Sequence, residues 1–221
     1  MTTFLLAFTA LFSIVNPLSG AFVFFGATQG AGSRLRAQLS RWVAIYAFSI
    51  VAASLYVGAY VLSFFGISLP VLKVAGGIVI AMSGWRMLSG PDTTEARRNE
   101  TERALPGSVN PSRLAFYPLT MPLTTGPGTI SVAISIGANR PTRLGAELEF
   151  LVATVLAAIL LSLLVYVLYR YCERLARALG ATGTTIVVRL SAFLLFCIGI
   201  QVLWTGAAEL LGTLRFAAPA A

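Results

Sequence analysis

The stretch FYPLTMPLTTGPGTI, from Phe116 to Ile130, decides how the rest of the chain is interpreted. It lies within an uncharged segment, Leu114 to Asn139, that is long enough to cross a membrane. Pro118, Pro122 and Pro127 interrupt this segment, and each proline removes a backbone donor and clashes with the preceding helical turn. Backbone groups freed in this way cannot turn to water in hydrocarbon. The sequence therefore predicts a broken helix that is buried in protein or lines a polar cavity, and we expect the functional centre here.

The composition is typical of an integral membrane protein. Of the 221 residues, 57% are hydrophobic and only 11% are charged, whereas soluble domains carry about a quarter charged residues. The chain has no His, which excludes imidazole acid–base chemistry and imidazole metal ligands. Cys172 and Cys197 lie in or beside apolar runs and are expected to be small buried thiols. We therefore expect a polytopic membrane protein with no cofactor and no metal site.

The chain is basic, with 16 Lys and Arg against 8 Asp and Glu and a net charge of +8. In a soluble protein this balance would favour nucleic-acid binding. Here the basic residues lie in short loops between apolar runs, which is the pattern of cytoplasmic loops in membrane proteins. We expect the lipid bilayer as a partner and no nucleic acid, and the oligomeric state stays open.

Six apolar segments predict six transmembrane helices and thus an all-α membrane protein. A cleaved secretory signal would need a basic start and a shorter apolar core, so we expect the first segment to be retained. Near the middle of this segment, Asn16-Pro17 predicts a second helix break. The six predicted helices are Thr3 to Ala27, Trp42 to Phe64, Val71 to Leu88, Leu114 to Gly137, Glu147 to Tyr169 and Val187 to Gly212.

The six helices divide into two halves of one integral membrane domain. Residues 1–90 form the first three-helix repeat, residues 91–111 a polar cytoplasmic linker and residues 112–213 the second three-helix repeat. Further loops are predicted at Ala138 to Arg143 and from Arg170 through Thr185. Most basic residues lie in or beside the loops after the first, third and fifth helices, so both termini are expected outside and the central loop in the cytoplasm.

The two predicted breaks occupy matching places in the two halves. Pro17 and Pro127 both interrupt the first helix of their half. Because three helices is an odd number, the second half must lie inverted in the membrane relative to the first. Interrupted helices at matching positions of two inverted repeats are typical of secondary transporters, whose sites lie near the bilayer midplane.

Four stretches carry a resemblance to a known family. They are Asn16-Pro-Leu, FGISLPVLKVAGGIVIAMSGWRML from Phe65 to Leu88, PLTMPLTTGPGTI from Pro118 to Ile130, and RLSAFLLFCIGIQVLWTG from Arg189 to Gly206. On these residues, and on the pattern PLxxPLxxGPG above all, the chain resembles the MarC family, also called UPF0056 or NAAT. The resemblance implies six helices in a bacterial inner membrane and relatedness to members described as transporters of small neutral amino acids such as glycine and alanine.

A half-helix that begins at a break carries unpaired N–H groups and a partial positive charge, which suit an amino-acid carboxylate. Carbonyls freed near Ser13 and Leu123 could accept from the ammonium group. Each residue also has a structural interpretation: Asn16 could cap a half-helix, and the threonines could bond back to their own helix. Gln201 could bond between helices, and Arg86 and Glu209, near helix ends, are expected to be structural. The candidate substrate-binding residues are Asn16, Pro17, Ser19, Gly20, Thr124, Thr125, Gly126, Pro127, Gly128 and Thr129.

The function predicted from these features is secondary transport of a small neutral amino acid by alternating access. A channel or passive pore, and a membrane protein without transport activity, are the alternatives. We expect no enzyme, because the chain lacks His, a carboxylate deep in a predicted span and a GxSxG motif. The missing deep carboxylate also leaves the coupling ion open between H⁺, Na⁺ bound by freed carbonyls, and uncoupled exchange.

Overall fold

The computed structural model describes residues 2–28, 31–89, 111–141 and 143–217, and within these ranges the regular structure is all helical. Five helices are long and apolar enough to cross a membrane: Thr2–Ala27, Ser33–Phe64, Leu69–Ser89, Gly145–Arg170 and Thr182–Thr213. The prediction of an all-α polytopic membrane protein is confirmed. The elements are α1 (Thr2–Val15), α2 (Pro17–Ala27), α3 (Ser33–Phe64), α4 (Leu69–Ser89), α6 (Pro111–Leu114), η1 (Ala115–Thr124), α7 (Pro127–Ala138), α8 (Leu144–Arg170) and α9 (Cys172–Ala217).

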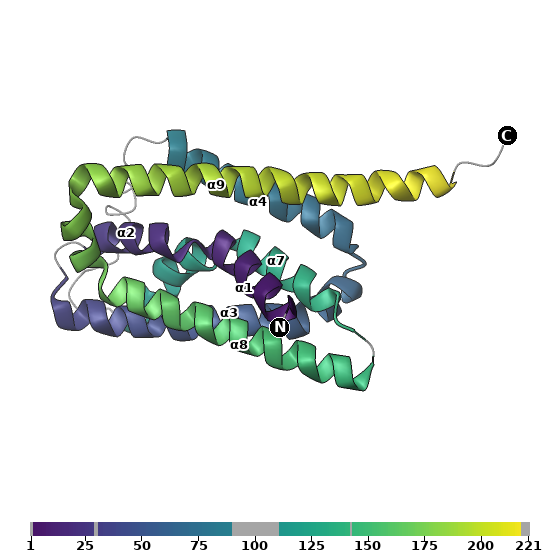
Figure 1. Ribbon diagram of the computed structural model, residues 1–221, viewed down its shortest axis with the longest axis horizontal. Coiled ribbons are helices and arrows are strands. Elements are labelled where there is room, and N and C mark those ends of the chain that lie inside the picture. The colour runs from purple at the N-terminus through teal and green to yellow at the C-terminus, as the bar shows by residue number, and fades with distance from the viewer. Residues whose placement is uncertain (1, 29–30, 90–110, 142, 218–221) are drawn as a thin grey trace.

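The helices form three layers (Figure 1). One layer is the pair α4 and α9, and the opposite layer is the pair α3 and α8. The interrupted segments, α1 with α2 and η1 with α7, lie between these two pairs and contact both. The broken helices are therefore shielded by long helices on two sides, as the cost of unpaired backbone groups in lipid requires.

The pair α4 and α9 is held together by close backbone contact. A Cβ added at Gly84 of α4 would lie 2.8 Å from the carbonyl oxygen of Ala192, and one added at Gly206 of α9 would lie 2.7 Å from the carbonyl oxygen of Pro70. Small residues that let two backbones approach are the usual means of helix packing in membranes.

The first interrupted segment breaks at Asn16, where the sequence predicts a break. Asn16 takes a left-handed conformation with φ 45° and ψ 61°, which Asn tolerates better than most residues. Its Oδ1 accepts a hydrogen bond from the N–H of Ser19 at 3.4 Å. Pro17 then occupies the first position of α2, where its fixed φ suits a helix start and its missing N–H costs nothing.

The second interrupted segment follows its prolines. Tyr117 and Met121, the residues before Pro118 and Pro122, are extended, with ψ of 126° and 120°. Gly126, before Pro127, is also extended, with ψ of 178°. A proline ring disfavours the helical conformation of the residue before it, which explains all three sites. The segment predicted as Leu114 to Gly137 is consequently divided into α6, η1 and α7.

Two predicted helix boundaries are wrong. The second helix begins at Ser33 rather than Trp42. The polar residues from Ser33 to Arg41 therefore form its first turns and not a loop. The loop predicted from Arg170 through Thr185 is almost entirely helical, and α9 begins at Cys172. Within α9 the change of direction occurs at Gly180, whose φ of 68° is open to glycine but strained for other residues. Of the predicted linker 91–111, residues 91–110 lie outside the described residues.

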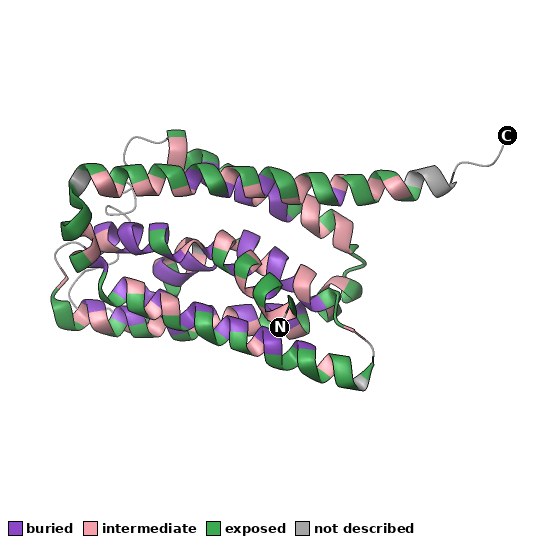
Figure 2. Cartoon of the chain, in the orientation of Figure 1, coloured by how far each residue is buried: buried purple, intermediate pink, exposed green. Residues whose placement is uncertain are grey.

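The long helices expose much of their outer surface (Figure 2). Large hydrophobic side chains on α8 and α9 are exposed, among them Leu160 at 41%, Leu163 at 54% and Phe193 at 52%. Such a surface is expected where the surrounding solvent is hydrocarbon. Cys172 is buried as predicted, but the prediction for Cys197 is wrong, because this thiol lies on the exposed side of α9.

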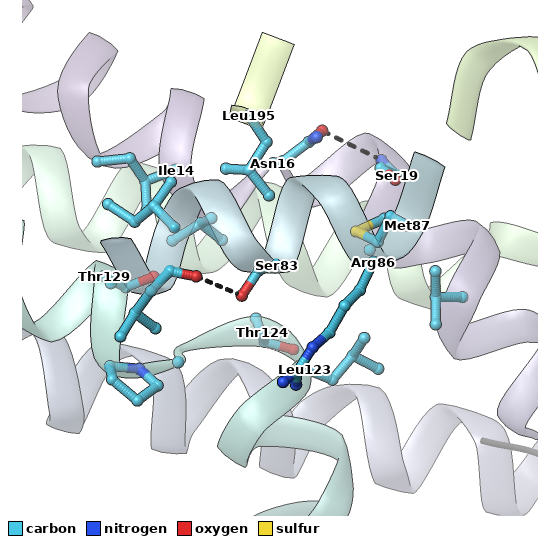
Figure 3. Close-up of a pocket in the computed structure, with 18 residues that line it drawn as sticks. Ile14, Asn16, Ser19, Ser83, Arg86, Met87, Leu123, Thr124, Thr129 and Leu195 are labelled. Carbon is cyan, nitrogen blue, oxygen red and sulfur yellow. Dashed lines mark hydrogen bonds between the residues drawn. The ribbon is translucent and has the colours of Figure 1, made fainter. Parts of the chain in front are cut away.

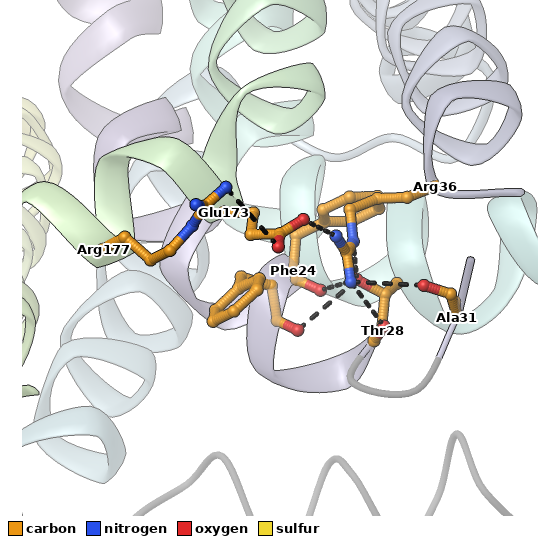
Figure 4. A network of polar contacts seen from close by, with 7 residues as sticks. Phe24, Thr28, Ala31, Arg36, Glu173 and Arg177 are labelled. Carbon is orange, nitrogen blue, oxygen red and sulfur yellow. Dashed lines mark hydrogen bonds and ion pairs between the residues drawn. The ribbon is translucent and has the colours of Figure 1, made fainter. Parts of the chain in front are cut away.

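A buried polar network joins α2, α3 and the start of α9 (Figure 4). The guanidinium of Arg36 donates to the carbonyl oxygens of Thr28 and Ala31 at 3.2 Å and 3.4 Å, and to Oε2 of Glu173 at 2.6 Å. Arg36 is only 8% exposed. Next to it, burial raises the pKa of the Cys172 thiol to about 11. The network therefore ties the first half of the chain to the second at this end of the molecule.

Candidate functional site

A cavity of about 190 Å³ lies where the two interrupted segments meet α4 (Figure 3). Its walls come from the junction of α1 and α2, the junction of η1 and α7, and one face of α4, with Leu195 of α9 closing one side. The cavity therefore draws residues from both halves of the chain.

The structure brings most of the predicted site residues to this one cavity. Those that line it are Asn16, Ser19, Gly20, Thr124, Gly126, Pro127, Gly128 and Thr129. Pro17 and Thr125 are buried beside the breaks but do not line it. Of the residues expected to offer carbonyls, Leu123 lines the cavity and Ser13 does not.

At the first break, polar groups of the α2 start face the cavity. Asn16 caps the half-helix through Ser19 N–H, so its structural interpretation holds, and it lines the cavity as well. Ser19 is only 1% exposed, and its hydroxyl has no hydrogen-bond partner among the described residues. A buried hydroxyl of this kind is uncommon, and bound water or a ligand is the usual explanation.

At the second break, Thr124 bonds within its own segment, as the structural interpretation expects, whereas the Thr125 hydroxyl has no hydrogen-bond partner among the described residues. Thr124 Oγ1 donates to the carbonyl oxygen of Leu119 at 2.8 Å, and Thr120 Oγ1 donates to that of Ala115 at 2.7 Å. After Gly126 the helix α7 begins without a side-chain cap. The first N–H groups of α7 consequently have no acceptor inside the helix and are available at the cavity wall.

Arg86 of α4 is the first residue that the sequence interpretation missed. It was expected to be structural because it lies near a helix end, but it lines the cavity. In Figure 3 its guanidinium reaches past Ser83 toward Leu123 and Thr124. Helical spacing carried the signal, since Ile80, Ser83 and Arg86 are three residues apart and share one face of α4.

Tyr169 of α8 is the second missed residue. It is fully buried, and its ring stacks on Phe24 of α2 with centroids 4.7 Å apart. Its hydroxyl lies 3.0 Å from Thr124 Oγ1 and directly over Gly20, where an added Cβ would collide with it. One side chain therefore connects the two breaks. Sequence alone gave no signal, because Tyr169 occupies an ordinary helix end.

Gln201 and Glu209 do not line the cavity. Gln201 is exposed on α9. Glu209 pairs with Lys73 at 2.6 Å between α9 and α4, which fits the structural role expected for it.

The cavity has an uneven charge balance. Arg86 is the one charged residue that lines it among the described residues, and no Asp or Glu of that part of the chain does so. No group of three or more His, Cys, Asp or Glu in the described ranges could hold a metal ion. Donors thus prevail over charged acceptors at this site, an arrangement that favours an anionic group such as a carboxylate.

Comparison with known proteins agrees with this architecture. Residues 1–211 match the model of the family described as MarC family integral membrane protein. The UPF0056 inner membrane protein MarC of Escherichia coli K12 is 33% identical over 213 residues, covering 94% of this chain and 95% of that protein. The protein of the same name from Shigella flexneri gives the same values. No solved structure matches the chain significantly. The chain therefore belongs to the MarC family of integral membrane proteins.

Proposed function

We propose that this protein is a secondary transporter of small neutral amino acids of the size of glycine or alanine, and that it works by alternating access between two inverted repeats. One observation carries the proposal: a single cavity is lined by residues of both helix breaks, one from each half of the chain. Transporters with inverted repeats bind their substrates at such broken helices.

The contacts between helices support the inverted repeat. In the proposed arrangement η1 and α7 together make the fourth crossing, so that α1–α2, α3 and α4 correspond to η1–α7, α8 and α9. Corresponding elements touch one another: α1 with α7, α3 with α8, and α4 with α9. The contact of α3 with α7 has its counterpart in α8 with α1 and α2, and that of α4 with α7 has its counterpart in α9 with α2. Exchanging the halves therefore keeps these main contacts, although the weaker contacts of α9 with α1 and α8 have no counterpart of similar size.

The size of the cavity supports a small substrate. The cavity has a volume of about 190 Å³. Glycine and alanine are of that order, whereas drug-sized ligands occupy pockets of about 300 Å³ or more.

The membrane and the orientation follow from the relatives and the charges. The curated relatives are named inner membrane proteins, so we place this chain in the bacterial inner membrane. From the distribution of basic residues we infer that both termini lie outside and that the central loop lies in the cytoplasm. For the coupling ion we propose Na⁺ or uncoupled exchange ahead of H⁺, because no described Asp or Glu lines the cavity to relay a proton.

Transport is tested in liposomes that contain the purified protein. Labelled glycine or alanine should enter in a saturable manner, and unlabelled amino acid inside should accelerate entry by counterflow. Large single-channel currents without counterflow would instead favour a passive pore. If no amino acid moves, the proposed function is refuted.

A pair of glycine variants links the flux to the cavity. An added Cβ at Gly128 would collide with the Ile80 side chain across the cavity wall, whereas one at Gly145 meets no atom within 4 Å. Gly128→Ala should therefore reduce uptake at least tenfold, and Gly145→Ala should leave it unchanged. Equal uptake by both variants would show that transport does not depend on this cavity.

A further inference from the structure

Two cations that join the halves of the chain pair with carboxylates, whereas the cation in the cavity pairs with none of the described residues. Arg36 pairs with Glu173 and Lys73 pairs with Glu209, each at 2.6 Å. Arg86 has no hydrogen bond or ion pair with any residue in the described ranges, and none of their carboxylates lines its cavity. Arg86 is exposed rather than buried, so its guanidinium is accessible to a ligand that enters the cavity. Charged residues within membrane segments are usually functional.

Two further features of the cavity favour negative charge. The starts of α2 and α7 both line the cavity, and a helix start carries a partial positive charge and unpaired N–H groups. Ser19, within the first turn of α2, is 1% exposed and lines the cavity, and its hydroxyl has no partner among the described residues. Arg86, Ser19 and the two helix starts come from three separate elements, and they converge on the same space.

We propose that Arg86 binds the carboxylate of the ligand, and that the site recognises this carboxylate rather than the ammonium group. A guanidinium can donate two parallel hydrogen bonds to one carboxylate, and the Ser19 hydroxyl can supply a further donor. None of the described Asp or Glu side chains lines the cavity, so none is placed to pair with an ammonium group there. Simple monocarboxylates such as propionate therefore bind the same cavity as alanine, whereas alaninamide, which keeps the ammonium and lacks the carboxylate, does not.

This inference shares its cavity with the proposed transport function but rests on binding alone. Purified protein in mild detergent is heated with increasing propionate, alanine or alaninamide, and the rise in Tm gives the apparent affinity, because a ligand of the native state stabilises it by mass action. Propionate and alanine should raise Tm in a saturable manner, and alaninamide should leave Tm unchanged.

Three variants locate the carboxylate. Arg86→Gln should weaken propionate binding at least tenfold. Arg86→Lys should recover part of the affinity, because the charge remains but the fork of parallel donors is lost. Arg189→Gln is the matched control, since Arg189 is exposed on α9 and does not line the cavity, and it should bind like the unaltered protein.

Each outcome decides the matter. The inference is overturned if Arg86→Gln binds propionate as tightly as the unaltered protein, if propionate does not bind, or if alaninamide binds as tightly as alanine. The last two comparisons use the unaltered protein and need no variant that could misfold. If propionate binds through Arg86 but no amino acid enters liposomes, the inference stands and the proposed transport function fails. If amino acids enter while Arg86→Gln binds normally, transport stands and the carboxylate site is elsewhere.

Discussion

The contact between Tyr169 and Gly20 allows a test of the site's architecture in which two damaging changes compensate one another. Gly20→Ala would place a methyl group in collision with the Tyr169 hydroxyl, and 3.3 Å from ring carbon Cζ. Tyr169→Phe removes that hydroxyl and, with it, the 3.0 Å hydrogen bond to Thr124. The double variant removes the hydroxyl that the methyl group would meet, so it should be more stable than the two single effects together imply.

The magnitudes follow from the contacts. Overpacking at Gly20 costs about 1–3 kcal/mol, from which roughly 0.5–1 kcal/mol is regained because alanine favours a helix. Loss of the Tyr169 hydroxyl costs about 1 kcal/mol, and Thr124 keeps its bond to the Leu119 carbonyl oxygen. The two single costs add to about 2 kcal/mol, whereas the double variant should lie within about 1 kcal/mol of the unaltered protein.

The free energy of unfolding is measured for all four proteins in mixed micelles, with the fluorescence of the native tryptophans as the signal. Tyr171→Phe is the matched control, because Tyr171 is 45% exposed two residues further along the chain and should show no coupling to Gly20→Ala. If the effects of Gly20→Ala and Tyr169→Phe add within about 0.5 kcal/mol, the hydroxyl does not lie over Gly20. The proposed link between the two breaks would then be wrong.

The polar network beside this contact yields two further predictions. Arg36→Gln should destabilise the protein by about 3 kcal/mol, because several buried acceptors lose their donor. Glu173→Gln should cost only about 1 kcal/mol, since the amide can still accept a hydrogen bond. Comparable losses of Tm in the two variants would contradict this asymmetry. In a Cys197→Ala background, Cys172 should resist maleimide at pH 7, because a pKa of about 11 leaves it almost entirely protonated and it is fully buried. Glu173→Gln should increase the labelling rate of Cys172 by loosening the packing over the thiol, and rapid labelling without that change would show that the thiol is accessible already.

Local chemistry explains which parts of the fold could be predicted from the sequence. Proline acts on its own residue and on the one before it, so Asn16-Pro17 and Gly126-Pro127 marked the two breaks whatever surrounds them. The extended residues Tyr117 and Met121 follow the same rule. The span of each apolar helix is similarly local, because it depends on the hydrophobic run itself.

Tertiary packing determines the features that could not be predicted from the sequence. Arg86 lies near the end of a helix, where a charge normally reaches the membrane surface, and its role depends on which face of α4 meets the breaks. Tyr169 reaches Thr124 across a sequence separation that no periodicity reveals. The basic segment after Arg170 was expected to be a loop because charge marks the edge of a membrane span. It folds instead as the first helical turns of α9, which are separated from α8 by Tyr171 and from the rest of α9 by the bend at Gly180.

The two ion pairs between the halves bear on how the proposed cycle could be balanced. One end of the molecule holds the starts of α3 and α9, which carry Arg36 and Glu173 (Figure 1). The other end holds the start of α4 and the end of α9, which carry Lys73 and Glu209. Both pairs measure 2.6 Å, and in each the cation is more buried than the carboxylate, with side-chain exposures of 10% and 46% for the first pair and 16% and 40% for the second. Opening either end by separating the halves therefore breaks a similar contact, because the backbone acceptors of Arg36, on Thr28 and Ala31, belong to its own half of the chain. A small ligand can shift an equilibrium only by its differential affinity for the two states. In the proposed cycle, the contacts at the two ends of the molecule are nearly matched. A modest preference of a bound carboxylate for one position of α4 is therefore sufficient to shift the equilibrium between the two open states.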